Sequence, residues 1–69
     1  MNKAGERIRY LRKSKKMSLD KLSKVTGVSR AAISRYENYQ ADISGDSLIA
    51  IAAFFKVTTD YLLGVTDYY

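Results

Sequence analysis

An all-α fold of five short helices is predicted from three features of this 69-residue sequence. Apolar residues recur at helical spacings along most of the chain, and no stretch alternates strictly enough to indicate a β-strand. Serine or threonine precedes most of the expected helices, where a hydroxyl caps the first turn, and glycine stands where helices are expected to end. Proline, which interrupts helices, is absent.

The first helix is expected over residues 3–15. Ala4, Ile8 and Leu11 recur at helical spacing on one face, which therefore packs into the core. Lysine and arginine crowd the end of this segment, where positive charge is favourable at the C-terminal end of the helix dipole.

Two shorter helices follow, over residues 19–25 and 30–37. Ser18 and Ser29 are expected to cap them, and Gly27 to end the first of the two in a left-handed conformation. The inward residues of the second are Ile33 and Tyr36.

The second half of the chain predicts a loop over residues 38–43 and two further helices. Ser44 caps a helix over residues 45–56, and Thr58 caps a last short one that Gly64 ends. The core stripe of the longer helix consists of Leu48, Ile51, Ala52 and Phe55, and the last helix contains Tyr61, Leu62 and Leu63.

Charge is distributed unevenly along the chain. Residues 1–35 carry eleven of the twelve Lys and Arg residues and two acidic ones, a net charge of +9. Residues 36–69 carry one Lys and five acidic residues, a net charge of −4. A basic side of this kind attracts polyanions, because each phosphate contact releases condensed counterions. The charge alone is equally compatible with a solvated surface that has no partner.

Several function classes receive no support from the composition. Histidine and cysteine are absent, the carboxylates are scattered and no phosphate-binding glycine loop is present, so we expect neither an enzyme nor a metal, cofactor or small-molecule site. No apolar run reaches the roughly 20 residues of a membrane span, and the first residues lack the apolar stretch of a signal peptide. We therefore expect a soluble, cytoplasmic protein.

The two central helices carry the main functional signal. Only residues 26–28 separate them, so the helices cross steeply, with Gly27 at a positive φ and Val28 in the core. The second of these helices then projects from the domain. Its outward residues are Arg30, Ala31, Ser34 and Arg35.

These segments resemble the lambda-repressor-like helix-turn-helix regulators, which include phage repressors, Cro proteins and the xenobiotic-response-element type of bacterial regulators. The motifs that carry the resemblance are residues 18–23, 27–29, 33–38, 48–52, 55–58 and 61–64. The resemblance covers about residues 4–64. We expect a single DNA-binding domain over residues 1–69, with its core at 4–64 and a short tail at 65–69.

The resemblance implies that double-stranded DNA is the partner and that the helix at Ser29–Asn38 reads the major groove. The matching base-reading positions are Arg30, Ala31, Ser34 and Arg35. An arginine can donate two hydrogen bonds to guanine O6 and N7, and an alanine can touch a thymine methyl group. The alternative for both arginines is contact with phosphates only.

The resemblance also implies contacts that position the domain without choosing sequence. The matching DNA-backbone positions are Ser18, Leu19, Ser29, Asn38, Tyr39 and Gln40. For the serines, plain helix capping is a compatible role. Arg12 and Glu37 match an internal salt bridge of the family, which ties the first helix to the end of the recognition helix.

Three positions depart from the family pattern. Glycine is common where Tyr39 stands, so the loop after the recognition helix is open to another path. Proline is common where Ile43 stands, which leaves the start of the fourth helix less defined. Val25 replaces a residue that is usually polar.

An apolar patch on the last two helices suggests a homodimer. Helix-turn-helix domains commonly bind palindromes as dimers, with half-sites about one DNA turn apart. The candidate interface consists of Ile49, Ala53, Phe54, Tyr61, Val65 and Tyr68, with Ala50 and Tyr69 nearby. The alternatives are that Phe54 completes the core of the monomer or that the tail is disordered.

The function predicted from these features is a transcriptional regulator, a repressor that binds a palindromic operator as a dimer. The competing hypothesis is a protein-interaction module, antitoxin-like or coactivator-like, that keeps the fold but not the DNA site. The two differ in whether function needs Arg30 and Arg35.

Overall fold

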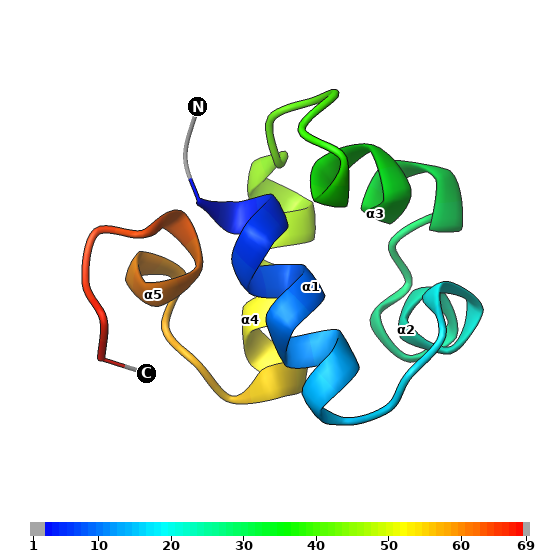
Figure 1. The fold of residues 1–69 in the computed structure, drawn as a ribbon, viewed down its shortest axis with the longest axis horizontal. Helices are drawn as coiled ribbons and strands as arrows, with labels where there is room; N and C mark the ends of the chain where they lie inside the picture. Colours follow the sequence, from blue (N-terminus) through cyan, green and yellow to red (C-terminus); the bar gives the residue numbers. More distant parts are fainter. Residues whose placement is uncertain (1–2, 69) are drawn as a thin grey trace.

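The computed structural model describes residues 3–68, and these form an all-α fold, as predicted (Figure 1). The helices are α1 (Ala4–Ser14), α2 (Leu19–Thr26), α3 (Arg30–Glu37), α4 (Gly45–Phe55) and α5 (Thr59–Leu63). Where bounds were predicted, they agree with these to within one residue, which is ordinary variation at helix ends.

The predicted helix caps are confirmed. The hydroxyls of Ser18, Ser29, Ser44 and Thr58 each accept a hydrogen bond from the backbone N–H three residues further on, at 3.0–3.2 Å. Gly27 and Gly64 end α2 and α5 with φ values of 78° and 83°, which glycine adopts without the clash of a Cβ. Local chemistry therefore sets most of the helix boundaries.

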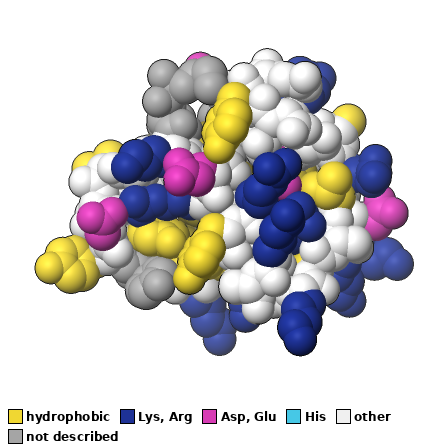
Figure 2. Space-filling view, in the orientation of Figure 1, with side chains coloured by type: hydrophobic (Ala, Val, Ile, Leu, Met, Phe, Trp, Pro, Cys, Tyr) yellow, Lys and Arg dark blue, Asp and Glu magenta, His cyan; other side chains and the backbone are white. Residues whose placement is uncertain are grey.

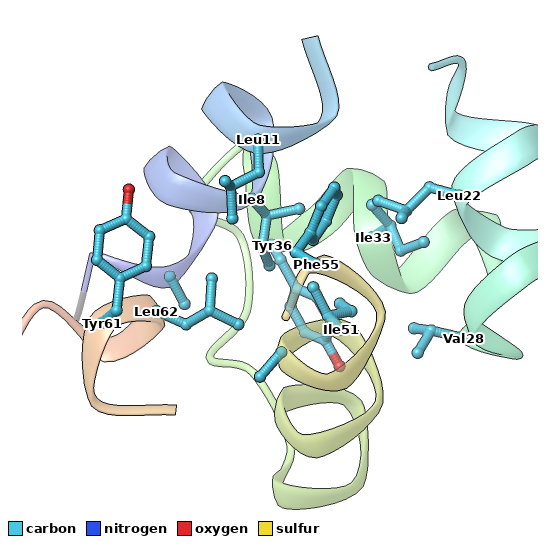
Figure 3. Packing of buried hydrophobic residues seen from close by; sticks show 12 residues of the cluster. Ile8, Leu11, Leu22, Val28, Ile33, Tyr36, Ile51, Phe55, Tyr61 and Leu62 are labelled. Carbon is cyan, nitrogen blue, oxygen red and sulfur yellow. The ribbon is translucent and has the colours of Figure 1, made fainter. Parts of the chain in front are cut away.

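Helix α1 lies at the centre of the fold, with α2 and α3 on one side and α5 on the other (Figure 1). The buried apolar side chains meet between these helices and α4 (Figure 3). They are Ala4, Ile8, Leu11, Leu22, Val28, Ile33, Tyr36, Ile51, Ala52, Phe55, Tyr61 and Leu62. Of the predicted core positions, Leu48 is only half-buried at the edge of this cluster.

Gly5 allows α1 and α3 to approach closely. A Cβ built at Gly5 would overlap the carbonyl oxygen of Tyr36, which belongs to the backbone of α3 and cannot turn aside. No role for this glycine was predicted from the sequence. Its lack of a side chain therefore allows the backbone of α3 to lie close to α1.

The predicted dimer patch needs two corrections. Tyr61 is only 8% exposed and is part of the core, because α5 packs against α1 and the Arg7 guanidinium lies 4.3 Å from the centre of the Tyr61 ring. Phe54 is half-buried, with its ring edge-on to Phe55 at 5.0 Å between ring centres, so it does help to complete the core of the monomer. Tyr69 lies outside the described residues.

The three departures from the family pattern leave the helices intact. Tyr39 adopts a left-handed backbone with φ of 59°, a conformation that glycine adopts more readily. Ile43 packs against the core directly before the Ser44 cap, so α4 has a defined start. Val25 is 40% exposed on α2.

None of the helices described between residues 3 and 68 has the length and hydropathy that crossing a lipid bilayer requires.

Candidate nucleic-acid interface

The turn between α2 and α3 is stabilised by helix caps, core packing and hydrogen bonds. Gly27 ends α2, Val28 is 8% exposed and anchors the turn in the core, and Ser29 caps α3. The hydroxyl of Thr26 donates to the Leu22 carbonyl at 2.7 Å and accepts from the Val28 N–H at 3.3 Å. These bonds satisfy polar groups at the end of α2 and stabilise the backbone that leads into α3.

Helix α3 has one buried and one exposed face. Ile33 is fully buried, and the hydroxyl of buried Tyr36 donates to Ser47 on α4 at 3.2 Å. On the opposite face, Arg30, Ala31 and Arg35 are exposed, while Ser34 is half-buried. The inner face of α3 thus contacts α1, α2 and α4. These contacts restrict rotation of the helix and so hold the orientation of its outer side chains.

The ion pair between Arg12 and Glu37 links α1 to the last residue of α3. The Glu37 carboxylate accepts from Arg12 Nε at 2.8 Å and from Arg12 Nη2 at 2.9 Å, and the residue is only 3% exposed. Arg12 Nη1 also donates to the Met17 carbonyl at 2.8 Å. Hydrogen bonding with Glu37 raises the pKa of Arg12 against the lowering effect of burial, so the arginine stays charged.

Arg9, which the sequence analysis did not single out, is a second cation at this carboxylate. Its Nε lies 3.4 Å from Glu37 Oε1, and its side chain is 48% exposed. Two arginines of α1 therefore place positive charge beside the end of α3.

The segment after α3 is held to the helix while its side chains stay exposed. Asn38 donates its side-chain amide to the Ser34 carbonyl at 2.9 Å, and the Gln40 N–H bonds the Arg35 carbonyl at 2.8 Å. Tyr39 between them is 52% exposed. Ser18 and Ser29 are also exposed, whereas Leu19 is half-buried against the core.

One ion pair joins the outer face of α3 to α2. Arg30 Nε lies 2.8 Å from Asp20 Oδ1, and the two side chains are 61% and 79% exposed. This pair was not predicted from the sequence. Acidic residues are scarce in the first half of the chain, which suggests that Asp20 pairs with one of the many cations there. Only the crossing of the two helices shows that this cation is Arg30.

Positive charge gathers on the side of the molecule where these features lie. Figure 2 shows dark blue side chains along the right and lower parts of this face, where α2 and the C-terminal end of α1 lie in Figure 1. The uneven charge of the sequence therefore becomes a basic surface beside the helix-turn-helix.

The exposed residues of the predicted dimer patch lie in two segments. Ile49, which is 63% exposed, and exposed Ala53 lie one turn apart on α4. Val65 and Tyr68 lie after α5 and are 73% and 84% exposed.

A family model described as "Helix-turn-helix" matches residues 8–62, which is most of the chain. The chain belongs to the helix-turn-helix family. It is 41% identical over 59 residues to repressor protein C2 of Salmonella phage P22, a match that covers 86% of this chain and 27% of that protein. It is 32% identical over 62 residues to the HTH-type transcriptional regulator YobD of Bacillus subtilis, covering 90% of this chain and 55% of that protein. The chain thus spans about half or less of the length of these relatives.

Solved helix-turn-helix structures superpose well on this fold. The P22 c2 repressor, determined in complex with a synthetic operator, gives a TM-score of 0.81 at 38% identity, covering 91% of this chain and 96% of that one. The N-terminal DNA-binding domain of SinR from Bacillus subtilis gives 0.79 at 33% identity, covering 87% and 88%. The resemblance inferred from the motifs is therefore confirmed at the level of family and fold.

Proposed function

We propose that this chain is the DNA-binding domain of a transcriptional regulator, and that α3 reads bases in the major groove of double-stranded DNA. The observation that carries the proposal is the two-faced α3, rigidly held on its inner side and exposed at Arg30, Ala31 and Arg35. We propose that residues 1–69 form one domain for this function, with its core at 4–64.

The outer face of α3 offers suitable chemistry for base recognition. Arg30 and Arg35 can each donate two hydrogen bonds to guanine, and Ala31 suits a thymine methyl group. Ser34 has a smaller role in this proposal, because it is half-buried and its hydroxyl accepts a hydrogen bond from the Asn38 side-chain amide at 3.4 Å.

We infer that the DNA backbone contacts come from both ends of the helix-turn-helix. Ser18 and Ser29 stand at helix N-termini, where the backbone N–H groups and the helix dipole favour a phosphate. Asn38, Tyr39 and Gln40 form an exposed segment at the other end. Leu19 contributes its backbone, since its side chain packs on the core.

We further propose that the chain is a repressor that acts as a homodimer on a palindromic operator. The related phage protein is named a repressor, and exposed Ile49 and Ala53 give α4 an apolar surface for a second copy. Val65 and Tyr68 are the further candidates, whereas Tyr61, at 8% exposed, offers little surface to a second copy.

Selection of binding sites from a pool of random DNA duplexes tests the proposal. The expected result is enrichment of a palindrome whose half-sites lie about one helical turn apart. Enrichment of a single half-site supports DNA reading but contradicts the dimer. A pool that stays random after repeated rounds at moderate salt contradicts DNA reading and favours a protein-interaction module.

A further inference from the structure

We propose that Asp20 is a specificity-determining positioning residue: it holds Arg30 ready for guanine and makes the same arginine a poor phosphate contact. This inference rests on the proposed function, since it concerns how the α3 surface discriminates among DNA sites. Asp20 touches no base in this proposal and acts only through Arg30.

The geometry of the ion pair leaves the guanine-binding edge of Arg30 available. Asp20 approaches Nε at 2.8 Å, and within residues 3–68 the structure records no other ion pair or side-chain hydrogen bond of the Arg30 guanidinium. The two terminal amino groups therefore keep their donors. Two parallel donors on one planar group are what guanine O6 and N7 require.

The pair also links the two helices of the motif. Asp20 lies in the first turn of α2, and Arg30 is the first residue of α3. Arg30 has a long and flexible side chain, and one fixed contact limits the directions in which its guanidinium can point. A preset direction lowers the entropy that is lost when the base contact forms.

The carboxylate affects phosphate and guanine contacts differently. A phosphate at Arg30 brings a full negative charge close to Asp20, and like charges at this distance repel. Guanine presents neutral acceptor atoms and meets much less repulsion. Asp20 therefore weakens sequence-independent binding more than it weakens binding at the selected site.

Because both side chains are largely exposed, the expected effect is modest. Asp20→Asn should tighten binding to a random-sequence duplex about threefold. The slope of log affinity against log salt should steepen by up to about one, the value for one additional phosphate contact. Binding to the duplex selected by the wild-type protein should tighten less, so the ratio of selected to random affinity falls by up to about threefold.

Asp60→Asn is the matched control. Asp60 is also exposed, also occupies the first turn of its helix, and has no ion pair within the described residues. It lies on α5, on the far side of α1 from α2 (Figure 1). Both variants raise the net charge by one and remove one favourable charge at a helix N-terminus. Asp60 is also farther from the helix-turn-helix, so the Arg30→Ala background is needed to separate the contact with Arg30 from the general effect of a charge near the DNA.

The experiment measures the affinities of wild-type protein, Asp20→Asn, Asp60→Asn, Arg30→Ala and the Asp20→Asn/Arg30→Ala double variant. Each is titrated with the selected and the random duplex at several salt concentrations, and thermal unfolding shows that each is folded. We expect Asp20→Asn to lower the affinity ratio in the wild-type background and to leave it unchanged in the Arg30→Ala background.

Two results would overturn the inference while leaving the proposed function intact. In one, Asp20→Asn changes the affinity ratio no more than Asp60→Asn does. In the other, Asp20→Asn has the same effect whether or not Arg30 is present. Failure of the proposed function looks different, because the wild-type protein then has no preference for any duplex, and the inference falls with it.

Discussion

Two of the arginine–carboxylate pairs of α3 lie at its opposite ends and have opposite characters. On the inner side, Arg12 makes two hydrogen bonds with the carboxylate of Glu37, which is 3% exposed. On the outer side, Arg30 makes a single contact with Asp20, and both side chains are mostly in solvent. The comparison shows two uses of charge in α3. The buried pair holds the end of α3 against α1, whereas the exposed pair orients Arg30 without fixing it.

The largest loss of stability is expected from Glu37→Ala. Removing one partner leaves Arg12 charged and mostly buried, which costs about 4 kcal/mol of unfolding free energy. Urea denaturation measures this loss, and Glu37→Gln is the milder variant if the alanine variant does not fold. The control is Asp67→Ala, whose carboxylate is 93% exposed beside Arg7 and should contribute under about 1 kcal/mol. Equal losses in the two variants would refute the contrast.

Gly5→Ala is the next largest expected effect, and it tests the inner face without changing charge. The new methyl group meets the backbone of α3 at Tyr36, so the helices must separate, at a cost of about 3 kcal/mol. Gly45→Ala is the control, because a Cβ at Gly45 meets nothing within 4 Å. Denaturation midpoints that shift equally for both variants would show that α1 and α3 are not closely packed.

On the outer face, Asp20→Ala should change the free energy of unfolding by less than about 1 kcal/mol, since an exposed pair contributes little. Thermal unfolding at low and moderate salt measures it, and any loss should shrink as salt screens the pair. A loss as large as that of Glu37→Ala would mean that the outer pair is structural.

The smallest expected effect lies in the loop that follows α3. Tyr39→Gly should stabilise the domain by about 0.5 kcal/mol, because relief of the left-handed backbone slightly exceeds the added freedom of the unfolded chain. Neighbouring Gln40→Gly, which has no positive φ to relieve, should destabilise it by a similar amount. Destabilisation by both variants, as judged by denaturation midpoints, would show that the Tyr39 side chain matters more than its backbone.

The sequence predicts the elements of this fold well because their signals are local. The caps at Ser18, Ser29 and Ser44 and the left-handed Gly27 each depend on a few neighbouring residues. The partnership of Arg12 and Glu37 was anticipated only through the family resemblance, and the structure brings the two side chains together.

Features that depend on how helices cross could not be predicted in the same way. The close approach at Gly5, the pairing of Asp20 with Arg30 and the burial of Tyr61 each join residues from different helices. The sequence does not show which residue of another helix each of them contacts. Arg7 is another example, because it donates to the carbonyls of Tyr61 and Thr66 at 2.8 and 2.7 Å.

The most direct test of the central claim, that the outer face of α3 reads bases, compares the base preferences of wild-type protein and Arg30→Ala at each position of the selected DNA site. The account predicts that the variant loses a guanine preference at one position of each half-site, by about 1–3 kcal/mol, while preferences elsewhere persist. A variant that binds every sequence more weakly by the same factor, with all preferences unchanged, would contradict the claim and make Arg30 a phosphate contact.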